Sequence, residues 1–358
     1  MDFLSRLKNL DWILNAAILF LAAASFLSIY GNKEVFYRQL IWYCIGLTVM
    51  FLASQIDWRP FLNYRWVIFA TYFFSLALLL FTYFFAPAIR GTKGWLTLGP
   101  LQFQTAEFAK LILIIVLSWF WAKAHIGVAR VKNLFLSFAY FALPAGLVMI
   151  QPDLGSALIL FGIWFGYLLI SGIKWKHLLI ALIILAIVAT LGWTSFLKEY
   201  QKDRILDFLH PGRDPLGVSY SVIQSKITIG SAGILGKGFG QGTQVKLGFL
   251  PEAHTDFILA SFIEEWGLLG GVLAIMAFLV LLTRIIKIGL ISENNFFKLF
   301  CLGSTVMFLS HFVLNVGSSV GLFPVVGVPF PFFSYGGSQI LTASFIIGII
   351  QSIIVRSR

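Results

Sequence analysis

Charged residues are scarce in this sequence. Only 11% of its 358 residues are Asp, Glu, Lys or Arg, against about 25% in ordinary soluble domains. Acidic residues are the scarcest, with 15 in the whole chain, while 59% of the residues are hydrophobic and the mean hydropathy is +0.90. This composition excludes an ordinary soluble domain and predicts a membrane protein. A carboxylate near the membrane core of such a protein is energetically costly and is therefore a candidate functional residue.

Cysteine is also nearly absent. The two cysteines, Cys44 and Cys301, fall inside apolar stretches, where we expect small buried side chains rather than a disulfide or a metal cluster. The net charge of +11 does not indicate nucleic-acid binding, because membrane topology and attraction to anionic headgroups account for more than half of the cationic residues. We expect membrane lipids as partners, and no nucleic acid.

Long apolar runs dominate what is present. A run that crosses a ~30 Å hydrocarbon core needs about 20 residues. Ten such runs occur, at 12–31, 38–56, 63–86, 103–123, 134–150, 154–171, 177–196, 256–283, 297–320 and 336–355. They lack the alternation of barrel strands. The sequence therefore predicts an all-α polytopic membrane protein with about ten transmembrane helices, and residues 1–358 as one integral-membrane domain.

The distribution of Lys and Arg over the short loops predicts the orientation. Fourteen of these residues lie on the side of the N-terminus, whereas the short loops of the opposite side hold only Lys33, Arg38, Arg90 and Lys93. Positive loops stay inside. Both termini are therefore expected in the cytoplasm. The first span follows a short basic tail and lacks a cleavage site, so we expect it to be an uncleaved anchor.

One connection is long. Residues 197–255, on the outer face between the seventh and eighth spans, run from a polar stretch through an amphipathic one (220–230) to a region with seven glycines between 230 and 248. The amphipathic part is expected along the membrane surface. The glycines suit a phosphate-cradling loop or a compact turn region. A dinucleotide fingerprint is discounted, because no predicted strand precedes them.

Few ionisable residues enter the predicted spans. Glu107 and Lys110 stand three residues apart at the start of the fourth span, on one helical face. They form either a salt bridge that fixes packing or the wall of a cavity. Asp153 opens the sixth span, where a carboxylate suits a helix N-terminus. A capping role is favoured, and Asp153 is also a candidate for the substrate cavity.

Asp256 stands at the lip of the eighth span, next to the long outer loop. With Thr255 it is suited to cap that helix, but His254 and Glu252 also lie close in sequence. A carboxylate at the water interface, partly shielded by apolar neighbours, is able to act as a general base. We therefore interpret Asp256 as functional and His254 as an assisting group or a local hydrogen-bond partner.

The last outer loop, residues 311–341, carries no Asp, Glu, Lys or Arg. Its prolines and glycines predict a broken helix at membrane depth, which is tolerated only where protein or a cavity shelters the backbone. The segment is expected either to support a site or to pack between helices.

Five separated motifs resemble the SEDS family of ten-span polymerases, which build peptidoglycan from lipid II. The motifs are RGTKGWLTLGPLQFQTAEFAKL, QPDLGSAL, HPGRDPLGVSYSVIQSKITIGSAGILGKGFGQGTQ, FLPEAHTDFI with EEWGLLGG, and NVGSSVGLFPVVGVPFPFFSYGGS. They span essentially the whole chain in order. The short N-terminal tail and the PVVGVPFPFFSYGG segment are more similar to the elongation branch than to the division branch. Gln339 and Thr105 depart from the usual pattern without removing a charged site residue.

The resemblance implies roles for particular residues. It makes Asp256 the catalytic carboxylate, Glu107 and Lys110 a cavity pair, and residues 210–242 a lid that contacts substrate and partner. Arg90 matches an outer-side motif together with Trp95. The candidates for holding the substrate pyrophosphate are cations of the outer loop: Arg204, Arg213, Lys226, Lys237 and Lys246.

The implied activity is inverting glycosyl transfer between lipid II molecules in the bacterial cytoplasmic (inner) membrane, with undecaprenyl pyrophosphate leaving. A divalent cation, Mg²⁺ or Mn²⁺, is expected to bind mostly through substrate phosphates. The implied partner is a class B penicillin-binding protein. Two alternatives stay open, a lipid II flippase and a non-catalytic scaffold. Polar residues clustered near the outer face favour chemistry over a path through the membrane.

Overall fold

The structure is a computed structural model, and the part of the chain that it describes contains 15 helices and strands. It describes residues 8–89, 91–99, 101–123, 131–170, 172, 179, 183, 190, 193–194, 199–210, 217 and 219–357.

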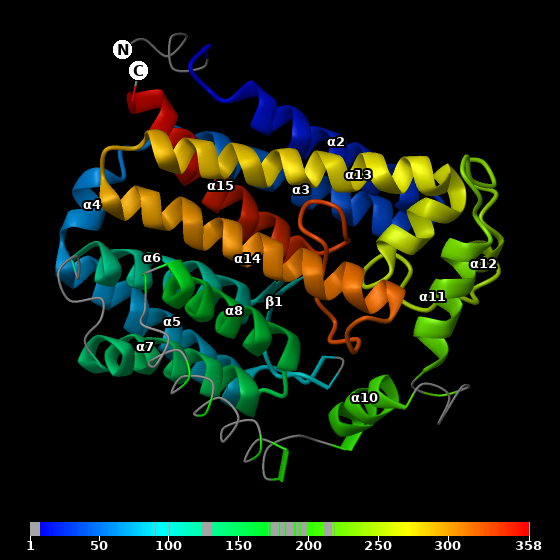
Figure 1. Ribbon diagram of the computed structural model, residues 1–358, viewed down its shortest axis with the longest axis horizontal. Coiled ribbons are helices and arrows are strands. Elements are labelled where there is room, and N and C mark those ends of the chain that lie inside the picture. The colour runs from blue at the N-terminus through cyan, green and yellow to red at the C-terminus, as the bar shows by residue number, and fades with distance from the viewer. Residues whose placement is uncertain are drawn as a thin grey trace. The chain divides into compact units, whose positions relative to one another are not determined.

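The long apolar runs form helices (Figure 1). They are α2 (Trp12–Ile29), α3 (Lys33–Gln55), α5 (Arg65–Phe85), α6 (Thr105–Lys123), α7 (Val131–Ile150), α8 (Leu154–Ile170), α13 (Ile258–Ile291), α14 (Asn295–Val320) and α15 (Gly337–Ser357). Eight have the length and apolar composition needed to cross a membrane, and α8 is a shorter apolar helix. Nine of the ten predicted spans thus coincide with a helix. The seventh, 177–196, falls mostly on residues outside the described part.

Among the described residues, four shorter helices connect or follow the spans. They are α4 (Arg59–Asn63), α10 (Glu199–Leu209), α11 (Tyr220–Gly230) and α12 (Thr243–Lys246). The last three belong to the long loop, and α11 coincides with the stretch that the sequence identified as amphipathic. The loop is therefore largely structured where it is described.

A small hairpin was not predicted. Strand β1 (Trp95–Leu98) pairs antiparallel with β2 (Leu101–Gln104), from Trp95 opposite Gln104 to Leu98 opposite Leu101. The amide of Thr105 donates to the carbonyl of Gly94 at 3.0 Å, which joins the hairpin to the first turn of α6. The predicted all-α fold class holds, and this hairpin is a small addition to it. The available signal was the Gly-Pro pair at 99–100, between two short runs of β-forming residues.

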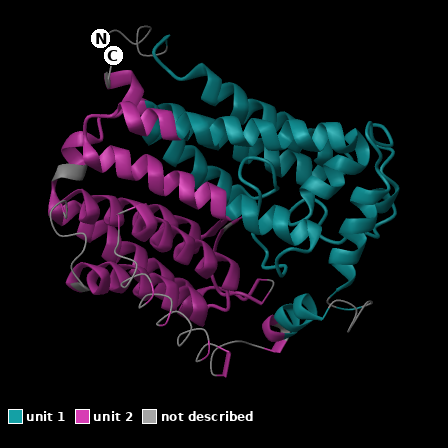
Figure 2. Cartoon of the chain, viewed as in Figure 1, with its two compact units in different colours: residues 1–53, 203–285, 311–351 teal, residues 54–202, 286–310, 352–358 magenta. Residues whose placement is uncertain are grey.

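The chain divides into two compact units, each composed of three separate stretches (Figure 2). Unit 1 contains residues 1–53, 203–285 and 311–351, and unit 2 contains residues 54–202, 286–310 and 352–358. The earlier expectation of one integral-membrane domain stays a prediction.

Helices α5, α6, α7 and α8 of unit 2 pack against one another. Tyr167 of α8 is buried among them. Its hydroxyl lies 2.7 Å from Ser118 Oγ and donates to the carbonyl of Leu299 at 2.9 Å, so it links α8 to α6 and to the first half of α14. A buried phenol is normally hydrogen-bonded, and these contacts satisfy it.

The two cysteines differ. Cys301, in the first half of α14, is buried as predicted. Cys44 on α3 is exposed, and the prediction of burial there is wrong. The reason is that Cys44 lies on an outward-facing side of α3, with exposed Ile41 three residues before it and exposed Thr48 four residues after it.

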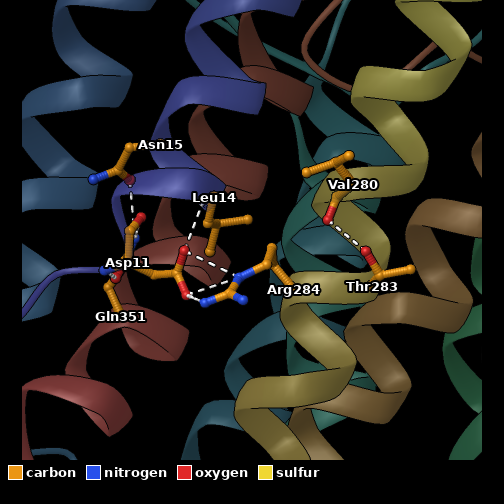
Figure 3. A network of polar contacts seen from close by, with 7 residues as sticks. All are labelled: Asp11, Leu14, Asn15, Val280, Thr283, Arg284 and Gln351. Atoms are coloured by element: carbon orange, nitrogen blue, oxygen red, sulfur yellow. Dashed lines mark hydrogen bonds and ion pairs between the residues drawn. The ribbon is translucent and has the colours of Figure 1, made fainter.

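A buried polar network joins three helices of unit 1 (Figure 3). The carboxylate of Asp11 caps α2 by accepting the amide of Leu14 at 2.8 Å, and it accepts Nε of Arg284 on α13 at 3.0 Å. Gln351 of α15 accepts the Asp11 amide at 2.8 Å and donates to Asn15 at 2.9 Å. The Asp11 side chain is 2% exposed. Its charge is therefore matched by both a helix N-terminus and a guanidinium.

We predict that Asp11→Asn lowers the stability of the protein. Asparagine keeps the cap but leaves the Arg284 guanidinium without its carboxylate, and breaking such a pair costs about 2–4 kcal/mol. Thermal unfolding in detergent measures the loss. Arg38→Gln is the matched control, because its pair with Glu34 is exposed at both ends and contributes little. An unchanged midpoint for Asp11→Asn would contradict the network's role.

Candidate functional site

Asp256 lies in a turn two residues before α13 begins. Its side chain is half-buried, and the residues around it, Leu250, Ala253 and Phe257, belong to a buried apolar cluster. A β-carbon placed on Gly327 would lie 3.9 Å from Oδ2 of Asp256, so the segment after α14 passes beside the carboxylate. The expected carboxylate at the lip of an apolar helix is therefore present, with partial shielding from water.

Three successive main-chain carbonyls of this turn accept hydrogen bonds from the 311–341 segment. The carbonyl of residue 254 accepts the amide of Tyr335 at 2.8 Å, that of 255 accepts Ser334 Oγ at 2.6 Å, and that of 256 accepts Asn315 Nδ2 at 3.1 Å. Such bonds fix the backbone without using the Asp256 carboxylate. The turn is thus held by the charge-free segment that the sequence predicted to support a site.

The same segment is irregular from Gly321 to Gly336, between α14 and α15, as its prolines and glycines predicted. Irregular backbone in a membrane protein needs hydrogen-bond partners from its surroundings. Side chains of neighbouring helices supply them: Asn315 donates to Val328 O at 2.8 Å, His311 Nδ1 lies 3.1 Å from Pro329 O, and Tyr43 donates to Phe332 O at 2.5 Å. The segment that holds the Asp256 turn is therefore itself held by side chains of α3 and α14.

Helix α13 is broken nine residues after it begins. Gly267 has φ 73° and ψ −178°, a conformation that side chains disfavour. Four backbone hydrogen bonds join the residues around the break to the glycine-rich loop: Lys237 N to Glu264 O, Gly238 N to Glu265 O, Leu268 N to Gly233 O and Leu269 N to Ile234 O, all at 2.9–3.2 Å. We call this contact the glycine clamp.

The glycine clamp requires glycine on both sides. A β-carbon on Gly236 would lie 2.2 Å from Glu265 O, and one on Gly267 would lie 2.1 Å from Ile234 O. No side chain fits at such distances. The sequence allowed either a phosphate-cradling loop or a compact turn region here. The contacts of residues 233–238 favour the compact turn region, because their backbone is packed against α13.

Glu264 is the most enclosed acid of the clamp region, with a fully buried side chain. Its carboxylate accepts Lys237 Nζ at 2.7 Å and Thr243 Oγ1 at 3.2 Å, together with the amides of Gln244 at 2.9 Å and Val245 at 3.3 Å at the start of α12. Four donors stabilise the charge. Lys237, a predicted pyrophosphate ligand, is therefore paired with a carboxylate. No local sequence pattern indicated this pair, since the partners stand 27 residues apart.

In unit 2, Glu107 and Lys110 form the predicted pair on α6. Lys110 Nζ lies 2.6 Å from Glu107 Oε1, and the two side chains are only 3% and 2% exposed. Removing two charges from water is costly unless they meet each other. The pairing is confirmed, and its expected place in a cavity wall stays a prediction.

Asp153 caps α8, as predicted. Its Oδ1 accepts the amide of Ser156 at 2.9 Å, and its Oδ2 accepts Nε2 of Gln104 at 2.6 Å. The carboxylate therefore also ties the end of β2 to α8. A direct role in substrate binding stays a prediction.

The remaining candidate cations differ in their surroundings. Arg204 on α10 donates to Val325 O at 3.1 Å, and exposed Lys226 on α11 lies beside Gly321, where a β-carbon would approach its Nζ to 2.5 Å. Both thus reach the segment that passes Asp256. Lys246 is exposed on α12. Arg213 and Arg90 lie outside the described residues.

His254 precedes the carboxylate in the turn. Burial lowers the pKa of its imidazole, and the Glu252 carboxylate only partly offsets this. Its Nδ1 is buried and has no hydrogen-bond partner among the described residues. His254 is therefore neutral near pH 7, which suits a hydrogen-bond partner of a substrate hydroxyl better than a ligand of an anion.

The described residues bring no three His, Cys, Asp or Glu side chains together as a metal site. The expected binding of Mg²⁺ or Mn²⁺ through substrate phosphates stays a prediction.

The fold and this site define a helical membrane protein with several spans. A family model described as "Cell cycle protein", for FtsW, RodA and SpoVE proteins, matches residues 7–358. The chain therefore belongs to this family, which confirms the SEDS resemblance.

Relatives and solved structures agree. The chain is 33% identical over 315 residues to the peptidoglycan glycosyltransferase MrdB of Escherichia coli K12, covering 86% of this chain and 82% of that protein. It is 35% identical over 350 residues to MrdB of Helicobacter pylori, covering 93% and 87%. The probable peptidoglycan glycosyltransferase FtsW of Haemophilus influenzae is 35% identical over 320 residues, covering 88% and 80%.

One solved neighbour comes from work on structural coordination of polymerization and crosslinking by a peptidoglycan synthase complex. It has a TM-score of 0.80 and 33% identity and covers 96% of this chain and 97% of its own. The rod shape determining protein RodA of Thermus thermophilus has a TM-score of 0.71 and 28% identity, with 96% of each chain covered. These neighbours and the MrdB relatives support the elongation branch.

We predict that Glu264→Gln loosens the glycine clamp and α12. Glutamine keeps the volume but loses the charge that four donors share, and hydrogen bonds to a charged group contribute about 1.5–3 kcal/mol. Hydrogen exchange should become faster in residues 231–248, and the melting temperature should fall. Glu199→Gln is the control, because that side chain is 85% exposed in its ion pair. Wild-type exchange rates in Glu264→Gln would show that the carboxylate does not hold the loop.

Proposed function

We propose that this chain is a peptidoglycan glycosyltransferase that polymerises lipid II during cell-wall elongation, with Asp256 as the general base. The family, the glycosyltransferase relatives and the RodA neighbours support the activity. The observation that carries the residue assignment is the turn of Asp256, a half-buried carboxylate on a backbone that three hydrogen bonds hold in place.

The proposed reaction displaces a lipid pyrophosphate with a sugar hydroxyl. Asp256 removes the proton from the 4-hydroxyl of the acceptor GlcNAc, and the oxygen attacks the anomeric carbon of the donor MurNAc. The bond from that carbon to the phosphate oxygen breaks, and undecaprenyl pyrophosphate leaves with the electron pair. Attack opposite the leaving group inverts the anomeric centre. A base held in position contributes typically about 10²–10⁴-fold to such a step.

The departing pyrophosphate carries negative charge that needs stabilisation. Arg204 and Lys226 are the candidates, because both contact the segment that passes Asp256. Cations placed where charge develops lower the barrier. Mg²⁺ or Mn²⁺ held by the substrate phosphates would share this role. In its own unit, the buried Glu107–Lys110 pair is proposed to line the substrate cavity.

The proposed setting is the bacterial inner membrane with both termini in the cytoplasm, as the Lys and Arg distribution predicts. The proposed partner is a class B penicillin-binding protein, which supplies transpeptidation. The synthase-complex neighbour, in which polymerization and crosslinking are coordinated, supports such a partner.

We predict that Asp256→Asn abolishes polymerisation. Asparagine has the same shape but cannot accept the proton, so the rate should fall by about 10²-fold or more. The assay uses purified protein in liposomes with labelled lipid II, with and without the penicillin-binding protein, and gel separation of glycan strands. Glu199→Gln is the control for a carboxylate outside the site.

The other outcomes are distinct. Normal polymerisation by Asp256→Asn would show that the base assignment is wrong. Movement of the labelled headgroup across the bilayer without polymer, in the unsubstituted protein, would favour the flippase. No polymer and no movement, even with the partner, would favour the scaffold.

A further inference from the structure

A pocket of about 150 Å³ lies within unit 2, apart from every residue of the proposed reaction. It is formed where three chain segments meet: the start of α4, the last turn of α6 and the start of α14. The lining residues are Arg59, Trp119, Ala122, Lys123, Asn294, Phe296 and Phe297. Two cations and three aromatic rings thus surround one small cavity.

The position of the pocket along its helices indicates the depth at which it lies. Lys123 is the last residue of the candidate span Thr105–Lys123, and the candidate span Asn295–Val320 begins next to Asn294. The ends of spanning helices lie at the level of the lipid headgroups, where cationic and aromatic side chains are enriched. The pocket therefore opens at headgroup level.

The surroundings of the pocket are positively charged. Lys123 Nζ lies 4.5 Å from the ring centroid of Trp119, and the guanidinium of Arg65 lies 5.9 Å from the same ring. Arg59 adds a third cation. Cation–π contact positions such groups without neutralising them.

Few carboxylates balance these cations. Asp57 lies 3.8 Å from Nε of Arg356, so its charge is shared with that guanidinium. Glu293 is exposed and adjoins the pocket residue Asn294 in sequence. Arg59, Arg65, Lys123 and Arg356 outnumber these two acids. The site has the net charge of a binding site for an anion.

One donor of a lining residue has no partner among the described residues. Nε1 of Trp119 is buried and has no hydrogen-bond partner among the described residues. A buried N–H without an acceptor is destabilising. A ligand oxygen that reaches this N–H would supply the acceptor.

We propose that this pocket binds the headgroup of an anionic phospholipid. Arg59 and Lys123 engage the phosphate, and the indole N–H of Trp119 donates to a phosphate or ester oxygen. The rings of Phe296 and Phe297 contact the glycerol and the first methylenes of the acyl chains. A dissolved phosphate ester offers the same charge, but the aromatic lining and the headgroup depth match the lipid. Bound lipid stabilises the junction of α4, α6 and α14 by mass action.

The test is native mass spectrometry of the full-length protein in a neutral detergent, titrated with short-chain phosphatidylglycerol. We expect saturable binding of one lipid with at least about tenfold preference over short-chain phosphatidylcholine. The double substitution Arg59→Gln with Lys123→Gln should weaken binding by about tenfold or more. Lys8→Gln, an exposed cation elsewhere, should bind as the unsubstituted protein does.

A charge-conserving variant separates binding from folding. Arg59→Lys with Lys123→Arg should retain phosphatidylglycerol binding, and both double variants should melt within a few degrees of each other without lipid. Equal binding of phosphatidylcholine, or unchanged binding by the Gln variant, would overturn the proposal. Glycerol phosphate that competes as strongly as the lipid would replace it with a site for a soluble phosphate ester.

Discussion

The break of α13 at Gly267 is the constraint on which the site in unit 1 depends. A helix that reverses its φ at one residue leaves backbone groups that need new partners, and the glycine clamp supplies four hydrogen bonds to them. The glycine-rich loop and α13 approach so closely that neither Gly236 nor Gly267 has room for a β-carbon. The glycine-rich loop and α13 are therefore tightly packed against each other, and this packing allows little adjustment.

The consequence is a short helical segment, residues 258–266, that is fixed at both ends. At its C-terminal end stand the glycine clamp and the buried Glu264 with its four donors. At its N-terminal end the 311–341 segment bonds three successive carbonyls around Asp256. A general base is effective only when it is held in position, and a misplacement of about 1 Å is able to cost about 10²-fold in rate. These three bonds restrain the backbone of the turn that carries the Asp256 carboxylate.

The features that depend on neighbouring residues in the sequence were predicted correctly. Hydrocarbon thickness demands long apolar runs, so nine spans were located; a three-residue spacing paired Glu107 with Lys110; and an acid before a helix gave the Asp153 cap. Long-range contacts had no such signal. Neither the pairing of Lys237 with Glu264 nor the bond from Asn315 to the Asp256 carbonyl follows from spacing, because both depend on the folded path of the chain. The hairpin at 95–104 was missed because four-residue strands carry little periodicity.

The role of the broken helix is tested by the lipid II polymerisation rate of Gly267→Ala, measured together with hydrogen exchange at the amides of residues 237, 238 and 268. The methyl group would meet Ile234 O at 2.1 Å, so we expect faster exchange at these amides and a rate lowered by about tenfold or more, with helix content unchanged. Gly248→Ala, at a similar positive φ but in open space, should retain activity. Wild-type polymerisation by a Gly267→Ala protein whose clamp has opened would contradict the claim that the broken helix positions Asp256.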